Sequence, residues 1–168
     1  MAVGLCLSAR AEVSKEYQLK AAFLYNFTKF IEWPPQHFAH GERPIVIGLV
    51  GTNFFDHELE KIVQSRKVNG REITIIQVES AAEARSADLL FFGDVEKQDS
   101  REILEAIRGT DILTVGQSEQ FSALGGMITF KMEVDKVRFE INQDSAEQAG
   151  LKISAQLLKL ATAVRKKT

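Results

Sequence analysis

Three glycine-containing segments are the residues of this chain best suited to bind a ligand. Gly51-Thr52-Asn53, Gly93-Asp94 and Gly116-Gln117-Ser118 each follow a short apolar run that is typical of a buried strand. In open α/β sheets the carboxyl ends of parallel strands lie along one edge, and small ligands bind there. We therefore expect the three segments to meet and to form a candidate ligand-binding site. Ordinary turn chemistry is the commoner reason for glycine at such positions.

Motifs for a cofactor, a metal or catalysis are missing from the sequence. The spacing of Gly48 and Gly51 is not that of a dinucleotide fingerprint, and there is no lysine-containing phosphate loop. His37 and His40 share a predicted loop with Glu42, but loop histidines are usually solvated, and no second ligand pair with zinc-like spacing follows. The chain has no nucleophile elbow, and its carboxylates are scattered. The sequence thus predicts no cofactor, no metal and no enzymatic activity.

Residues 17–35, YQLKAAFLYNFTKFIEWPP, are the most distinctive stretch and are predicted to form an amphipathic helix. At 3.6 residues per turn the apolar side chains share one broad arc, which is typical of a helix packed on a sheet. We expect Ser14 to cap the helix and Pro34 and Pro35 to end it, because proline lacks a backbone N–H. The arc consists of Tyr17, Leu19, Ala21, Phe23, Leu24, Phe27, Phe30 and Ile31.

Two residues of this stretch are candidates for contacts with a protein partner. Lys20 falls in the middle of the apolar arc, where a charge is costly unless it reaches solvent or finds a carboxylate. We expect its ammonium to reach solvent, and a partner or ligand contact is the alternative. Trp33 follows the helix, and tryptophan is enriched at binding hot spots, although burial in the core explains it equally well. Binding would then involve the polar side of the helix and the loop that carries Trp33.

The composition is that of one globular domain. The chain has 168 residues, of which 45% are hydrophobic and 26% are charged, so it can bury a substantial core. Its formal net charge of −2 and its pI of about 6.0 exclude a basic field that would recruit nucleic acid. No apolar run approaches the roughly 18–20 residues that span a bilayer.

The first eleven residues (1–11) are predicted to be the remnant of a signal peptide. The apolar run MAVGLCL precedes Ala9-Arg10-Ala11, which has the small-x-small pattern that signal peptidase accepts. No basic segment comes first, so either the true start lies upstream or this is an ordinary cytosolic N-terminus; we favour export. Cys6 does not fit a lipoprotein signal, because Leu5 precedes it. Cleavage would leave residues 12–168 as a domain without cysteine.

Four apolar runs alternate with segments of helical periodicity, a pattern that predicts parallel strands connected by helices. Asn69-Gly70 is a strong turn signal, Ser80 is expected to cap a short alanine-rich helix, and Gly109 is expected to end the next helix. The predicted strands are 45–50, 72–78, 88–92 and 111–115, and the predicted helices are 54–65, 80–86 and 100–108.

The pattern changes in the last third of the chain. Residues 127–133 and 136–142 alternate apolar and polar side chains around Val134-Asp135, which predicts an antiparallel hairpin. A short helix at 143–149 and a final helix capped by Ser154 follow. The predicted fold is α/β, a single-domain sandwich with a mainly parallel sheet flanked by helices and a C-terminal antiparallel hairpin. The inward-facing positions of the final helix are expected to be Leu157, Leu158, Ala161 and Val164.

Several blocks of this sequence resemble the YfiR-like family of periplasmic regulators. The first is residues 20–34 (KAAFLYNFTKFIEWP), followed by 125–130 (GGMITF) and 137–142 (VRFEIN). The closing block is 149–161 (AGLKISAQLLKLA). Their order and spacing match the family across nearly the whole of residues 12–168. The resemblance implies an exported α/β domain without established catalytic activity.

The resemblance also implies a function. A member of this family restrains a membrane-bound diguanylate cyclase by binding its periplasmic part, which lowers cyclic-di-GMP output and biofilm formation. A sensor kinase is the alternative partner that the resemblance implies, an outer-membrane lipoprotein can sequester such a regulator, and a homodimer is a candidate assembly. Without cysteine after processing, disulfide-based control does not carry over to this chain. The second hypothesis is a periplasmic small-molecule-binding sensor module for a kinase or cyclase, with its ligand at the strand-end glycines.

Overall fold

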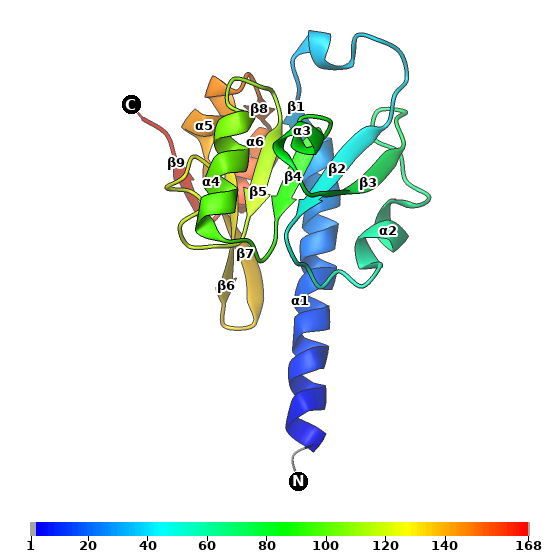
Figure 1. Ribbon diagram of the computed structural model, residues 1–168, viewed down its shortest axis with the longest axis vertical. Coiled ribbons are helices and arrows are strands. Elements are labelled where there is room, and N and C mark those ends of the chain that lie inside the picture. Colours follow the sequence, from blue (N-terminus) through cyan, green and yellow to red (C-terminus); the bar gives the residue numbers. More distant parts are fainter. Residues whose placement is uncertain (1–2, 168) are drawn as a thin grey trace.

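A seven-stranded sheet forms the centre of the computed structural model, which describes residues 3–167 (Figure 1). Its strands are β2 (Ile45–Val50), β3 (Ile73–Val78), β4 (Leu89–Phe92), β5 (Leu113–Gly116), β6 (Ile128–Glu133), β7 (Lys136–Asn142) and β9 (Ala163–Arg165). They are ordered β3-β2-β4-β5-β6-β7-β9. All neighbours pair in parallel except β6 and β7, which form the antiparallel hairpin. The predicted fold class is confirmed.

Helices cover both faces of this sheet, so each face buries its own apolar cluster. The helices are α1 (Val3–Phe30), α2 (Glu58–Val63), α3 (Ala81–Ala84), α4 (Lys97–Ala106), α5 (Gln143–Gln148) and α6 (Ala155–Leu160). α1 and α2 contact each other on one face, and α3 and α4 lie together on the other (Figure 1). The α1 face carries the larger cluster, which includes most of the aromatic residues.

The first helix starts earlier than predicted. α1 begins at Val3 and runs without a break to Phe30, so Ser14 lies inside the helix and does not cap it. The reason is local: most of residues 5–12 are the good helix formers leucine, alanine, arginine and glutamate, and no proline interrupts them. The N-terminal half of α1 projects well beyond the sheet (Figure 1), and its residues 6–13 are exposed.

The second half of α1 supplies the aromatic core that the sequence predicts. The Phe27 ring lies 5.8 Å from the Phe130 ring and 5.3 Å from the Phe139 ring, measured between centroids. Phe23 makes similar contacts with the same two rings. Such pairs contribute about 0.5–1.5 kcal/mol each beyond the area they bury. Leu19 was expected on this buried arc but is 40% exposed, although Tyr17 and Lys20 on either side of it in the sequence are buried.

The two predicted tight turns are both present. Asn69 and Gly70 have φ of 51° and 78° and connect the hydrogen-bonded pair of Val68 and Arg71. In the β6–β7 hairpin Val134 and Asp135 have φ of 40° and 63°. Positive φ at both central residues is what a two-residue hairpin turn requires.

Helix ends agree with two of the three predicted serine caps but not with every predicted length. Ser80 Oγ accepts from Glu83 N–H, and Ser154 Oγ accepts from Leu157 N–H, so both caps are confirmed. α2 is shorter than predicted because Asp56 and His57, which precede it, have positive φ values that are not helical.

The end of the chain departs from the prediction of one long helix. α6 ends at Leu160, and Val164 lies in β9, where it is 41% exposed and pairs with Ile141 of β7. The position of Val164 was predicted from helical periodicity, which no longer applies once Ala161 adopts an extended backbone.

A two-stranded pairing links the exit of α1 to the C-terminal region. In β1 (Ile31–Glu32) and β8 (Lys152–Ile153), Ile31 pairs with Ile153 in antiparallel fashion. A 3-10 helix, η1 (Pro35–Phe38), follows β1 directly. Strands of two residues carry no readable periodicity, so this pairing could not be predicted from sequence patterns.

Candidate binding sites at the two edges of the sheet

The predicted strand-end segments do come together at the carboxyl edge of the sheet. Thr52 N–H donates to Asp94 O at 3.1 Å, and Asp94 N–H donates to Thr52 O at 2.7 Å, which joins the loop after β2 to the loop after β4. These strands are the point at which the strand order reverses, where open α/β sheets bind ligands. Here the two backbones occupy the centre of that crevice themselves.

The glycines of these segments are required by close packing. A Cβ at Gly93 would lie 2.2 Å from Thr52 O, and a Cβ at Gly51, whose φ is +75°, would lie 2.3 Å from Val95 Cγ2. A Cβ at Gly116 would lie 2.4 Å from the Phe121 ring. The space in front of these glycines is therefore filled by protein, and a ligand role for the segments stays a prediction.

One open space remains next to the predicted ligand segments. A cavity of about 470 Å³ lies beside Gly51, between the carboxyl ends of β2 and β3 and the starts of α3 and α4. Gln77 and Val95 line it, and Glu79, Asp99 and Glu102 make it acidic. Thr52, Asn53, Gly93, Asp94, Gly116, Gln117 and Ser118 do not line it.

Lys20 is held inside the protein at the same edge. Its side chain is only 3% exposed, so the expectation that it reaches solvent was wrong. Lys20 Nζ donates to Gln117 Oε1 at 2.8 Å, forms an ion pair with Glu16 one helical turn earlier, and lies 4.8 Å from the centre of the Tyr17 ring. A lysine can remain buried where a carboxylate, an amide oxygen and an aromatic face surround its ammonium. The structure thus brings Lys20 and Gln117, predicted for separate sites, into direct contact.

Tyr17 completes this cluster. Its hydroxyl and the Gln117 side-chain amide are hydrogen bonded, with Gln117 Nε2 3.1 Å from the Tyr17 hydroxyl oxygen. Burial raises the pKa of Tyr17 above its usual value of 10.0, the Gln117 hydrogen bond lowers it in part, and the negative charges of Glu16 and Asp94 raise it further. Tyr17 therefore stays neutral in the folded protein and anchors the root of the projecting half of α1.

Exposed apolar side chains gather around this root. We use the term projecting end for the N-terminal half of α1, the loop that carries Phe54 and the tip of the β6–β7 hairpin, all of which lie at the carboxyl edge of the sheet (Figure 1). Phe54 is 48% exposed and its ring contacts that of Tyr17. Among the described residues, six of the eight exposed large hydrophobic side chains belong here: Leu7, Val13, Leu19, Phe54, Met132 and Val134.

Trp33 lies at the opposite, amino edge of the sheet. Its ring stacks on His37 at 5.8 Å between centroids and packs edge-on against Phe38. Trp33 is half-buried against the main core, and its Nε1 is buried without a hydrogen-bond partner among residues 3–167. Lys20 and Trp33, both predicted to contact a partner, therefore cannot belong to one continuous patch.

A buried polar network beneath Trp33 was not foreseen. His37 was expected to be solvated, but its side chain is 7% exposed: Nε2 lies 2.6 Å from Asp88 Oδ1, and Nδ1 lies 2.8 Å from Asp111 Oδ2. The Arg43 guanidinium donates to both Asp88 oxygens at 3.0 and 2.9 Å, and Val46 N–H donates to Asp88 Oδ2 at 2.7 Å. The hydrogen bond to Asp88 raises the pKa of Arg43.

The sequence did carry a signal for this network. Asp88 and Asp111 each stand just before a buried strand, and parallel neighbours begin at the same edge of a sheet. The His37 ring is placed there by η1, which the two prolines after Trp33 initiate. Metal binding was not predicted, and among the described residues no group of three His, Cys, Asp or Glu side chains could hold an ion.

The match to a family model gives these sites a context. A model described as YfiR/HmsC-like matches residues 17–162. The chain belongs to the YfiR/HmsC-like family. Over residues 3–167, no helix has both the length and the apolarity needed to cross a membrane.

Two solved structures resemble this YfiR/HmsC-like chain at low sequence identity. A conserved domain protein from Vibrio cholerae is 14% identical with a TM-score of 0.50, over 71% of this chain and 54% of that one. An ABC domain from Streptococcus pneumonia in complex with L-Trp is 12% identical with a TM-score of 0.49, over 72% and 55%. The chain therefore spans about half the length of the structures it matches, and the likeness concerns the fold alone.

Proposed function

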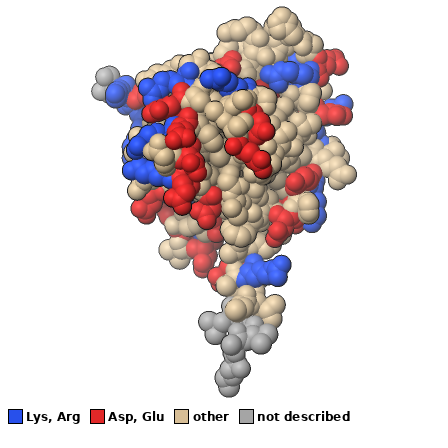
Figure 2. Space-filling model, in the orientation of Figure 1, with Lys and Arg blue, Asp and Glu red and all other residues tan. Residues whose placement is uncertain are grey.

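We propose that the protein is a periplasmic regulator that binds the periplasmic part of an inner-membrane diguanylate cyclase and restrains cyclic-di-GMP production. The YfiR/HmsC-like match over residues 17–162 supports this class of partner. The charges also fit a protein partner better than a nucleic acid, because acidic and basic side chains are interspersed and no broad basic area is seen on the face in Figure 2. A sensor kinase remains the alternative inner-membrane partner.

One structural observation carries the proposal: apolar side chains are exposed together at the projecting end. Leu19 precedes Phe23 by one helical turn, and Met132 follows Phe130 on the same face of β6, so both extend the packed Phe23–Phe130 contact outward. Neither is covered, since Leu19 is 40% and Met132 is 50% exposed. Large apolar side chains exposed in one region of the surface are typical of a protein-interaction site.

Val134 adds independent support for this location. It is 93% exposed and adopts a φ of 40°, a conformation that β-branched residues rarely adopt. Asparagine or glycine would suit the turn better, so an exposed valine costs stability at this position. Residues held in an unfavourable backbone conformation of this kind cluster at functional sites. We infer that Val134 and Met132 are presented by the hairpin to the partner.

Export would reshape the projecting end. We propose that residues 1–11 are removed, which leaves 12–168 as the YfiR-like domain and shortens α1 by about two and a half turns. Ser14 would then lie near the new helix start, where its hydroxyl can serve the cap that the sequence predicts. An outer-membrane lipoprotein that sequesters the regulator, or a second copy, would compete for the same exposed apolar side chains.

A binding assay with matched variants tests the proposal. The periplasmic part of a membrane cyclase or kinase from the same organism is captured with the purified protein, and cyclic-di-GMP and surface attachment are measured in cells. Met132→Glu and Val134→Glu should abolish capture and raise cyclic-di-GMP, because a carboxylate on an apolar contact must be desolvated. Leu160→Glu is the control, since Leu160 is 61% exposed outside the projecting end. Equal capture by all three variants would rule out the projecting end, and an unchanged deletion phenotype with no captured signalling protein would rule out the function.

A sensor module for a small ligand is the second candidate function. The acidic cavity beside Gly51 favours it, because the cavity lies where open α/β sheets bind ligands. Ligand binding there could also change partner affinity by favouring one of two states. A thermal-shift screen of nucleotides and amino acids should raise the Tm if the cavity is used, whereas a flat response across the panel would argue against it.

A further inference from the structure

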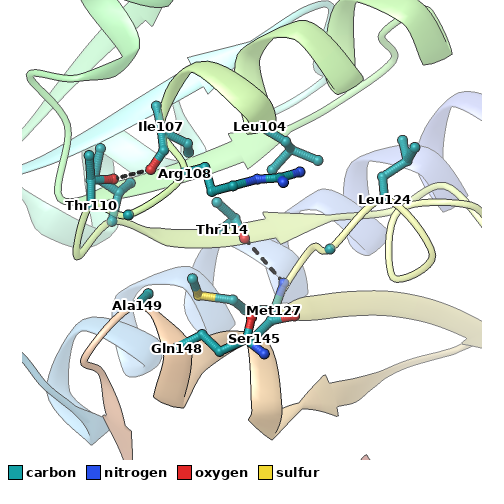
Figure 3. A pocket seen from close by; sticks show the side chains of 13 residues that line it. Leu104, Ile107, Arg108, Thr110, Thr114, Leu124, Met127, Ser145, Gln148 and Ala149 are labelled. Carbon is teal, nitrogen blue, oxygen red and sulfur yellow. Dashed lines mark hydrogen bonds between the residues drawn. The ribbon is translucent and has the colours of Figure 1, made fainter.

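A second cavity of about 470 Å³ lies on the amino side of the sheet, and none of the strand-end glycine segments lines it. It is enclosed by the end of α4, the strand β5, the loop before β6, and α5 (Figure 3). Its floor is apolar, because Ile107, Ile112 and Met127 are buried there, while Arg108 and Gln148 at the rim are exposed. This volume is within the range of small-molecule sites, about 300–1,000 Å³.

Arg108 gives the cavity its charge. It is the one charged side chain among the lining residues, and no carboxylate lines the cavity, although the chain has 23 acidic residues. Within residues 3–167 its guanidinium makes no hydrogen bond or ion pair. Figure 3 shows the side chain extended from the end of α4 above β5 toward Leu124. A guanidinium in this position can bind a carboxylate through two parallel hydrogen bonds.

The polar atoms deeper in the cavity are already satisfied. Thr114 Oγ1 accepts from Met127 N–H at 3.1 Å, and Thr110 Oγ1 donates to Ile107 O at 2.5 Å (Figure 3). The second of these bonds occupies a carbonyl at the end of α4, so the negative end of that helix is partly covered. The floor therefore offers apolar contacts, and the free hydrogen-bond donors lie at the rim.

We propose that this cavity binds a small amphipathic carboxylate. The apolar body would lie against Ile107, Ile112, Leu124 and Met127, and the carboxylate would pair with Arg108 at the rim. This assignment goes beyond the proposed function, because it concerns a ligand and not the membrane partner, and it uses a different cavity from the one beside Gly51.

Calorimetry on the intact purified protein, without any partner, tests the proposal. Octanoate is the probe; octanamide keeps the apolar body without the charge, and acetate keeps the charge without the body. Octanoate should bind best, and Arg108→Gln should weaken it by about tenfold or more, because a charge-assisted contact is lost. Octanamide should bind the wild type and Arg108→Gln equally, and acetate should not bind.

Two further variants keep the test decisive. Leu124→Trp should fill the cavity and abolish octanoate binding with Arg108 still present. Arg101→Gln removes an exposed arginine from α4, the helix that ends two residues before Arg108, and should leave binding unchanged. Circular dichroism confirms that each variant is folded. Absence of octanoate binding to the wild type, or equal loss in Arg108→Gln and Arg101→Gln, would overturn the proposal without bearing on partner capture.

Discussion

Lys20 and Asp88 are both charged, both almost fully buried at 3% and 1% exposure, and both lie at an edge of the same sheet. Their surroundings differ. At the amino edge, Asp88 accepts from Val46 N–H and from both Arg43 nitrogens, and it contacts His37. At the carboxyl edge, the Lys20 ammonium donates to the side chain of one glutamine and pairs with one partly exposed glutamate. Exposed apolar side chains lie next to this cluster.

The comparison teaches that burial of a charge does not by itself mark a functional site. The Asp88 network connects η1, β2 and the loops before β4 and β5, and the protein supplies all of these contacts. The Lys20 cluster connects α1 to a single loop and borders the projecting end. We therefore expect the first to serve stability and the second to serve binding.

Replacing Asp88 should have the largest effect. Asp88→Ala leaves Arg43, His37 and Val46 N–H without their acceptor, and removing one partner of a buried ion pair costs about 3–5 kcal/mol. Urea denaturation at pH 7 measures the loss in the free energy of unfolding. Asp111→Ala is the matched control, because Asp111 also contacts His37 but is 29% exposed, and it should cost no more than about 1 kcal/mol. Similar losses in the two variants would mean that the network is not the stabilising unit.

Replacing Lys20 should have a smaller effect on stability. Lys20→Met keeps the apolar stem and removes the charge, and exchanging a buried ion pair for an apolar group is often neutral, so we expect a change within about 1 kcal/mol. Partner capture should weaken, because Glu16 and Gln117 lose the ammonium that orders them. Lys29→Met, an exposed lysine on the same helix, is the control for both measurements. If Lys20→Met unfolds the protein as readily as Asp88→Ala, the contrast between the two edges fails.

The smallest expected effect is a dependence on alkaline pH. Because the pKa of Tyr17 is raised in the folded protein, the unfolded chain loses this proton first as the pH passes 10.0, and the free energy of unfolding falls. Tyr17 is neutral in both states at pH 7 and contributes no pH dependence there. Between pH 10 and pH 11 the wild type should lose up to about 1 kcal/mol more than Tyr17→Phe. Equal losses in the free energy of unfolding for the two proteins over this pH range would show that Tyr17 is not buried as described.

Sequence patterns predicted the regular parts of this fold because the signals are local. Apolar runs identify β2 and β4, and serine caps and turn residues mark several boundaries within a few residues. The projecting start of α1 was missed because its helical propensity continues through a segment that was interpreted as a signal peptide. The β9 strand was missed because a short exposed strand has no periodic apolar pattern.

The candidate sites were less predictable because their contacts are distant in sequence. His37 and Asp88 are 51 residues apart, and Lys20 and Gln117 are 97 residues apart. The sequence placed the three glycine segments at one edge, and the Thr52–Asp94 pairing bears this out for two of them, but it could not tell whether that edge would be open. Packing decides this, and packing at a strand end is not encoded in composition or spacing.

The Phe121 side chain restricts which sequences can adopt this fold. Its ring lies where a Cβ would stand at both Gly116 and Gly126, at 2.4 and 2.2 Å, while Phe121 itself is only 1% exposed. The three positions must therefore vary together: a side chain at either glycine is compatible only with a smaller residue at 121. In an alignment of related chains, an aromatic residue at this position and glycine at both others should be inherited as a set.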